Sequence, residues 1–81
     1  MKLEINKVAK LNNDEKYIIL NELSYEGNYY YLTMGLINDK EFDSSKVVIL
    51  KEASDTEGYY IEKVTDNILL YELTKKFKEQ L

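Results

Sequence analysis

Two stretches of similar composition lie on either side of the dipeptide Glu26-Gly27, and they constrain the fold more than any other feature of the chain. Residues 16–25 (KYIILNELSY) and 28–36 (NYYYLTMGL) are rich in aromatic and β-branched side chains, which favour strands. Glycine readily adopts the positive φ that a two-residue reversal requires. The pattern therefore predicts a β-hairpin that turns at Glu26-Gly27.

A two-residue loop also determines which side chains of this hairpin share a face. One face is predicted to carry Tyr17, Ile19, Leu23, Tyr25, Tyr30, Leu32, Met34 and Leu36. The opposite face is predicted to carry Ile18, Leu20, Glu22, Ser24, Tyr29, Tyr31 and Thr33. One extra loop residue would reverse this pairing of faces, because side chains alternate along a strand.

A second hairpin is predicted further along the chain. Residues 46–52 (KVVILKE) form a short apolar run that is typical of a central strand. Residues 54–58 (SDTEG) indicate a turn, and residues 59–64 (YYIEKV) the returning strand. The polar residues 37–45 (INDKEFDSS) are predicted to form a loop between the two hairpins.

The N-terminal stretch fits two structures. Leu3 and Ile5 alternate as in a strand, whereas Ile5, Val8 and Leu11 also fit one face of a helix. Of these we favour the strand, followed by a turn at residues 12–14 (NND).

After Asp66 the apolar residues recur at steps of three and four, which predicts an amphipathic helix. Thr65 or Asp66 can cap its first turn, and lysines near its end suit the helix dipole. The apolar stripe consists of Leu69, Leu70, Leu73, Phe77 and Leu81. The predicted fold is a single α+β domain over residues 1–81, an antiparallel β-meander of four to five strands with the C-terminal helix packed on one face.

Missing residue types exclude several classes of function. The chain has no cysteine and no histidine, so disulfides, the usual zinc sites, thiol nucleophiles and imidazole bases are excluded. All 11 basic residues are lysines and the net charge is −4, which argues against direct nucleic-acid binding. We find no signal-peptide pattern and no apolar run of membrane-spanning length, and we therefore expect a cytoplasmic protein with no membrane partner. Abundant Lys, Asn, Ile and Tyr is typical of AT-rich genomes, as in a low-GC bacterium or its phage.

The acidic residues suggest two kinds of chemical site, a calcium site and a pair of catalytic carboxylates. Asp39, Glu41 and Asp43 alternate as calcium ligands do, but the sixth and twelfth positions are Ser44 and Leu50 instead of glycine and glutamate. Paired carboxylates could hydrolyse glycosides, yet an 81-residue chain has too small an interior for a deep pocket. We predict no metal, no cofactor and no enzymatic activity.

The order of the elements resembles the YrzB-like family of small acidic bacterial proteins, a domain of unknown function. The resemblance depends on residues 23–30 (LSYEGNYY), on residues 47–50 (VVIL), on the acidic turn before Tyr59-Tyr60 and on the closing Leu/Phe helix. This chain differs in being only mildly acidic and in its run of three tyrosines. Because the family has no assigned activity, the resemblance implies no functional residue.

Tyrosine is the most informative residue type, with eight Tyr against two Phe and no Trp. Tyrosine suits the half-buried surface of a thin sheet, and it is also enriched at interfaces. If the helix covers one face of the sheet, the other face is apolar at its centre, which is typical of a partner or dimer interface. The residues predicted to bind the partner are Ile18, Leu20, Tyr29 and Tyr31.

The predicted function is a non-catalytic interaction or regulatory module that binds a protein partner or a second copy of itself. The alternative is a phage-type inhibitor that presents an acidic surface to a nucleic-acid-handling enzyme. That alternative requires acids gathered on one side, whereas here they are interleaved with lysines, as in Asp14-Glu15-Lys16 and Glu62-Lys63.

Overall fold

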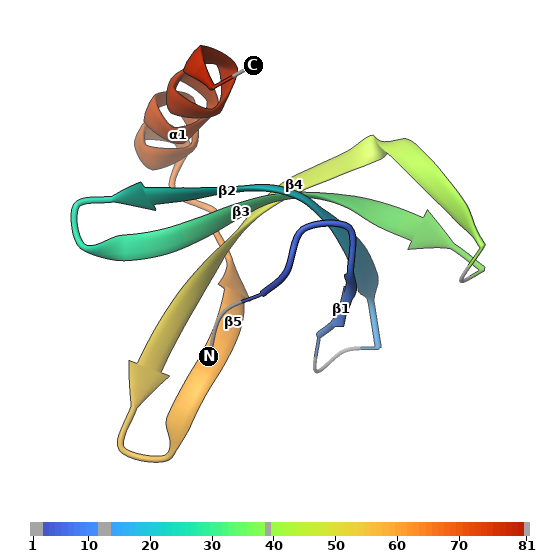
Figure 1. The fold of residues 1–81 in the computed structure, drawn as a ribbon, viewed down its shortest axis with the longest axis horizontal. Coiled ribbons are helices and arrows are strands. Elements are labelled where there is room, and N and C mark those ends of the chain that lie inside the picture. Colours follow the sequence, from blue (N-terminus) through green and yellow to red (C-terminus); the bar gives the residue numbers. More distant parts are fainter. Residues whose placement is uncertain (1–2, 12–13, 39, 81) are drawn as a thin grey trace.

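The computed structural model describes residues 3–11, 14–38 and 40–80. These residues form one five-stranded antiparallel sheet, in the order β1-β2-β3-β4-β5, and a C-terminal helix (Figure 1). The elements are β1 Val8–Lys10, β2 Lys16–Tyr25, β3 Asn28–Ile37, β4 Glu41–Asp55, β5 Gly58–Lys63 and α1 Asn67–Glu79. The predicted α+β class and antiparallel meander are confirmed, with five strands.

The sheet curls into a half-barrel, and each of its two faces carries a small core. On the inner face, toward β1 and the N-terminal segment, one cluster consists of buried Ile19, Tyr31 and Leu50 with Leu3, Ala9, Leu11, Val48 and Ile61 packed against it. On the outer face, toward α1, a second cluster consists of buried Tyr30, Ile49, Leu73 and Phe77 with Leu23, Tyr25, Leu32, Val64, Leu69 and Leu70 around it. Figure 1 shows α1 and β1 on opposite sides of the curled sheet.

The β2–β3 hairpin turns at Glu26-Gly27 as predicted, with φ of 51° and 84° at these two residues. From Tyr25 to Asn21, β2 pairs with β3 without interruption, but Leu20 is then skipped and Ile19 pairs with Thr33. Such a β-bulge shifts the alternation of side chains by one residue. The predicted faces are therefore correct for the tip of the hairpin and wrong for Tyr17, Ile18 and Ile19 at its base.

β4 is much longer than predicted, and the loop predicted at residues 37–45 is wrong for Ile37 and for residues 41–45, which belong to β3 and β4. The strand already begins at Glu41, which pairs with Ile37, and Phe42 pairs with Leu36. Backbone pairing does not require apolar side chains, so a polar stretch can continue a sheet into solvent. The ladder next pairs Gly35 with Asp43 and Met34 with Val47, so residues 44–46 form a bulge.

Asp43 stabilises this bulge from within. Its carboxylate accepts hydrogen bonds from the Ser45 hydroxyl at 2.6 Å and from the Ser45 backbone N–H at 3.0 Å. These hydrogen bonds lower the pKa of Asp43 below its ordinary value. A carboxylate held in this way serves the local backbone conformation.

The N-terminal segment contains the short strand β1 and no helix within residues 3–11. The strand occupies Val8–Lys10, so Leu3 and Ile5 precede it and do not belong to it. Part of the predicted turn, residues 12–13, lies outside the described residues, and Asp14 has a φ of 67°. The Leu3 N–H donates to the Tyr31 hydroxyl at 3.1 Å, which places this segment across the inner face.

The C-terminal helix begins after Asp66, whose carboxylate accepts hydrogen bonds from the N–H groups of Ile68 at 2.9 Å and Leu69 at 3.2 Å. This is one of the two predicted caps, and it satisfies donors that the first turn leaves open. Leu73 and Phe77 are buried in the outer-face cluster. Leu81, the last residue of the predicted stripe, lies outside the described residues.

We predict that Phe77→Ala lowers the free energy of unfolding by about 2–4 kcal/mol, because it leaves a cavity in a thin core. Urea denaturation followed by circular dichroism measures the change. The control is Ile68→Ala on the same helix, where the side chain is exposed and the loss should stay below about 0.5 kcal/mol. Equal losses in the two variants would contradict the buried position of Phe77.

Gly35 provides a second test of the fold, at the bulge of β4. A Cβ at Gly35 would lie 2.9 Å from the Lys46 Cβ, closer than two carbons can approach. We expect Gly35→Ala to destabilise the chain by about 1–3 kcal/mol, the usual effect of overpacking. In a Lys46→Gly background, where the clashing atoms are absent, the same substitution should cost distinctly less. A cost that is unchanged in that background would exclude the clash as its cause.

Candidate functional site

The four residues predicted to bind a partner do not share a surface. Tyr31 is 0% exposed and belongs to the inner-face cluster. Ile18 pairs with Met34 on the outer face, and Leu20 lies exposed at the bulge. Tyr29 is exposed near the hairpin tip. The prediction of a common face is therefore wrong, because the bulge redirects Ile18 and the inner face is covered by the N-terminal segment.

Tyr31 is a structural residue of the inner core. Its hydroxyl accepts the Leu3 N–H and donates to the Glu52 carboxylate at 3.2 Å. Burial is the main cause that raises the pKa of Tyr31 above its ordinary value. The side chain thus connects the N-terminal segment to β4, and the sequence pattern alone could not distinguish this role from an exposed one.

A polar contact closes the open side of the half-barrel. The Lys63 ammonium, at the end of β5, donates to Glu15 Oε1 at 2.8 Å and lies 5.5 Å from the centroid of the Tyr17 ring. The Tyr17 hydroxyl donates to the other Glu15 oxygen at 2.8 Å. The hydrogen bond to Glu15 raises the pKa of Lys63, and burial raises that of Tyr17. Both groups keep their protons at neutral pH, so neither is suited to act as a general base.

The acidic residues offer no metal centre in the part of the chain that is described. Across residues 3–11, 14–38 and 40–80, no three acidic side chains converge in a way that could hold an ion. Of the alternating acids, Asp39 lies outside the described residues and Asp43 is hydrogen-bonded to Ser45. The arrangement supports a structural role for Asp43.

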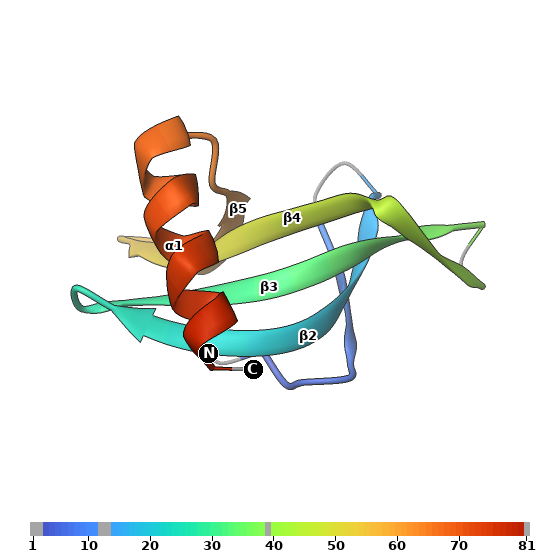
Figure 2. The ribbon, with the colours of Figure 1, turned by 90° about the horizontal axis from the view of Figure 1, so that it is seen from above.

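The outer face carries an uncovered apolar surface beyond the helix. Figure 2 shows α1 over one end of the sheet, while the far end of β3 and β4 extends away from it. At that end Val8, Ile18, Met34 and Val47 lie directly opposite one another across four strands. We name the outer patch this row together with the neighbouring pair Leu36 and Phe42. Val8, Val47 and Phe42 are exposed, the last at 58%.

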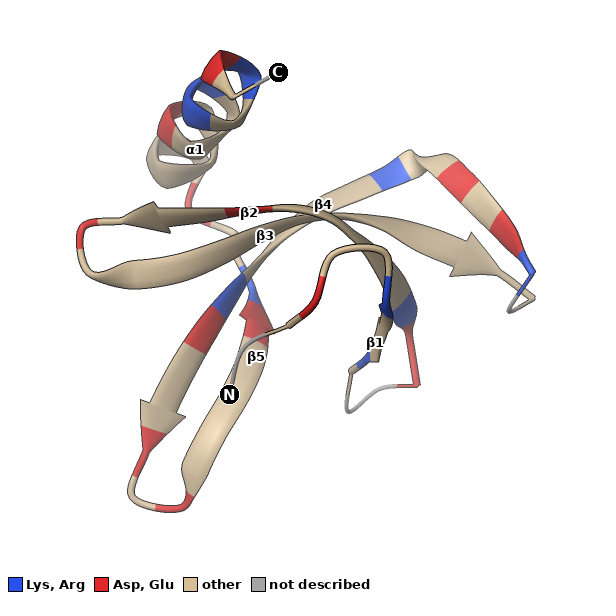
Figure 3. Cartoon of the chain, viewed as in Figure 1, with Lys and Arg blue, Asp and Glu red and all other residues tan. Residues whose placement is uncertain are grey.

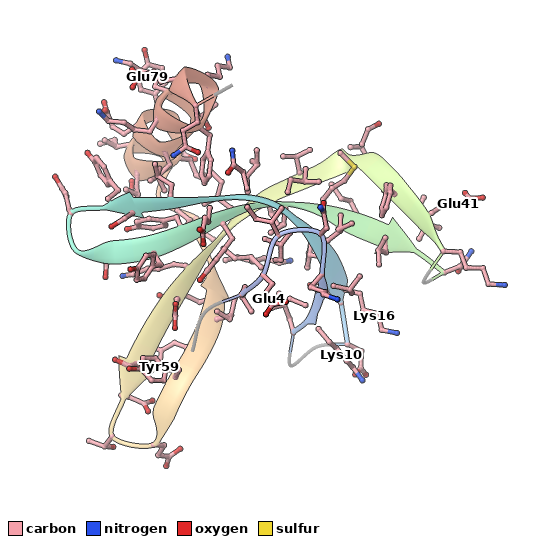
Figure 4. The ribbon with its side chains drawn as sticks, in the orientation of Figure 1. Glu4, Lys10, Lys16, Glu41, Tyr59 and Glu79 are labelled. Carbon is pink, nitrogen blue, oxygen red and sulfur yellow. The ribbon has the colours of Figure 1, made fainter. Side chains whose placement is uncertain are left out.

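A groove lies at the opposite end of the molecule, between the two hairpins. The β3–β4 ladder ends at Tyr30 and Lys51, and beyond this pair β3 follows β2 while β4 follows β5. The space between the hairpins has a volume of about 640 Å³. Three exposed tyrosines line it, Tyr29, Tyr59 and Tyr60. We name it the tyrosine groove, and Figure 4 labels Tyr59 on the β4–β5 hairpin that forms one side.

Negative charge collects at this end of the molecule. The segments that form the groove and its mouth, residues 26–29 and 51–62, contain five of the 15 acids and one of the 11 lysines. The rest of the chain then carries ten residues of each sign. Figure 3 shows the acids at the two hairpin tips and along the β4–β5 hairpin. An acidic surface of the kind that the inhibitor alternative requires would lie here.

The raised pKa values predict how stability depends on pH. Tyr17, Tyr31 and Lys63 all bind their protons more tightly in the folded chain, relative to unfolded values of 10.0 for tyrosine and 10.5 for lysine. Their contribution is therefore complete below about pH 10 and is lost as the pH rises further. We expect the free energy of unfolding to fall as the pH rises above about 10.

The substitution Tyr31→Phe tests whether the raised pKa of Tyr31 contributes to this pH dependence. At pH 7 the variant should be less stable by about 1–2 kcal/mol, because the Leu3 N–H loses its acceptor. At pH 11 the two chains should differ less in their free energy of unfolding. The unmodified chain loses stability as Tyr31 ionises, whereas phenylalanine does not ionise. Urea denaturation at both pH values measures the free energy of unfolding of each chain. A difference between the two chains that is the same at pH 7 and pH 11 would contradict a raised pKa at Tyr31.

No helix within the described ranges is long and apolar enough to cross a membrane. No protein-family model matches the chain, and no curated protein or solved structure shows significant similarity to it. The resemblance to YrzB-like proteins therefore stays a prediction, and any functional conclusion has to come from the two surfaces just described.

Proposed function

We propose that this chain is a non-catalytic interaction module that binds a second protein chain through the outer patch. The observation that carries the proposal is the apolar row Val8–Ile18–Met34–Val47, which crosses four strands on a face that α1 leaves open. Isolated apolar side chains are normal on protein surfaces, but contiguous ones are typical of contact sites.

The shape of the patch also favours a protein partner. Side chains that stand opposite one another on neighbouring strands form a continuous apolar strip, the kind of surface that packs against another sheet or helix. Phe42 adds an aromatic anchor at the border, and aromatic residues are enriched at interfaces. Of the residues predicted from the sequence to contact a partner, Ile18 belongs to this strip and Leu20 lies on the bulge beside it in the chain.

A second copy of the chain is the partner that this patch fits best. Lys10 and Lys16 pair next to the row on its β1–β2 half, and Leu36 and Phe42 pair next to the same side of the row on its β3–β4 half. A twofold axis that runs along the strands between β2 and β3 would place the lysine pair of one copy over the Leu36–Phe42 pair of the other. The apolar strips then meet, and the lysines of the two copies stay apart.

Sedimentation equilibrium over micromolar to millimolar concentrations tests the proposal. We expect a monomer–dimer equilibrium that the double variant Phe42→Ser/Val47→Ser weakens about 10- to 100-fold, as for the loss of interface anchors. Because both side chains are exposed, the variant should remain folded by circular dichroism.

The matched control is Ile68→Ser, which removes an apolar side chain that is 79% exposed on α1, outside the patch. Its dimerisation should equal that of the unmodified chain. A chain that stays monomeric at millimolar concentration, or a control that weakens the dimer as strongly, would contradict self-association through the outer patch.

A further inference from the structure

We infer that the tyrosine groove is a second binding site, which takes a lysine or arginine side chain presented by a segment of a partner protein. This site lies at the other end of the sheet from the outer patch and does not depend on the proposed function. The inference rests on three observations: the size of the groove, its aromatic lining and the charge around it.

The size and lining suit one long side chain with its flanking backbone. A volume of about 640 Å³ is within the range of sites that enclose small ligands. Tyr29 reaches the groove from the β2–β3 hairpin, and Tyr59 and Tyr60 reach it from β5. Aromatic faces that remain accessible in a concave site attract cations through the ring quadrupole and cover the aliphatic part of a lysine or arginine.

Two other tyrosine rings of the described chain lie beside ammonium groups. Lys63 lies 5.5 Å from the centroid of the Tyr17 ring, and Lys75 lies 5.7 Å from that of Tyr71. In the groove, the lysine that lines the wall is Lys51, which stands opposite Glu62 in the β4–β5 ladder. Glu52 and Glu62 also line the groove, so the charge beside the tyrosines favours a cation.

The charge selects a cation over the other ligands that stack on tyrosine. The five acids in segments 26–29 and 51–62 account for the whole negative excess of the chain, since the remaining residues are balanced. Such a concentrated field attracts a basic segment over long distances and repels phosphate groups. Nucleic acids and nucleotides are therefore disfavoured as occupants, although their bases could stack.

Titration with three acetylated and amidated heptapeptides tests the inference: AKAKAKA, ARARARA and AEAEAEA. Backbone amide shifts in ¹H–¹⁵N spectra report the site of binding. We expect the lysine and arginine peptides to shift Tyr29, Tyr59, Tyr60 and Glu62, and the glutamate peptide to shift none of them. Affinity for the basic peptides should fall as the salt concentration rises from 20 to 300 mM, because the attraction is electrostatic.

Two variants distinguish specific binding in the groove from nonspecific electrostatic attraction of the basic peptides to an acidic protein. Tyr59→Leu removes a groove ring that is 63% exposed, and Tyr71→Leu removes a ring that is 65% exposed on α1, outside the groove. We expect Tyr59→Leu to weaken peptide binding about three- to tenfold, as for a lost cation–π contact, and Tyr71→Leu to leave it within twofold. Equal effects of the two variants, or shifts spread over the whole surface, would overturn the inference.

The outer-patch variant Phe42→Ser/Val47→Ser serves as the independent control. It should bind the basic peptides as tightly as the unmodified chain, since none of its changed residues lines the groove. Dimerisation and peptide binding can therefore fail independently. A chain that does not dimerise can still bind the peptides, and a chain that does not bind the peptides can still dimerise. Preserved dimerisation together with no binding of either basic peptide would overturn the groove inference alone.

Discussion

The bulge at Leu20 is the constraint on which the arrangement of both cores depends. With this one residue skipped, β2 directs Leu23 and Tyr25 toward the helix at its tip, and Tyr17 and Ile19 into the half-barrel at its base. A regular strand would place all four on the same side. The bulge lets one ten-residue strand contribute to two cores on opposite faces, and it adds to the twist that curls the sheet.

Each core is closed by a single short element, and this leaves surfaces open. The N-terminal segment covers the inner face through Leu3 and its hydrogen bond to Tyr31, while α1 covers the outer face through Leu73 and Phe77. Neither element is long enough to cover a whole face of a sheet whose β4 runs for 15 residues. The outer patch is the end of the outer face that α1 leaves uncovered, and the tyrosine groove lies where the two hairpins diverge, so both follow from the fold as much as from their composition.

The sequence predicted the elements better than the surfaces. The bounds of β2, the turn at Glu26-Gly27 and the cap at Asp66 depend on local backbone preferences, which neighbouring residues reveal. The bulge could not be located, because residues 17–20 (YIIL) are all apolar and match either alternation. The extension of β4 past Asp43 was hidden by polar side chains. The groove depends on where the pairing of β3 with β4 ends. This pairing joins residues far apart in the sequence, so a local sequence pattern cannot predict it.

β5 connects two features that were described separately. At one end Tyr59 lines the tyrosine groove, and at the other end Lys63 is bound to Glu15 across the open side of the half-barrel. The strand is six residues long, or roughly 17 Å at the usual rise per residue, and it pairs along one side with β4. Because all six residues are paired with β4, this one strand fixes both the Tyr59 side of the groove and the Lys63 ammonium beside Glu15. The groove and the closure of the half-barrel are thus held in place by the same β4–β5 pairing.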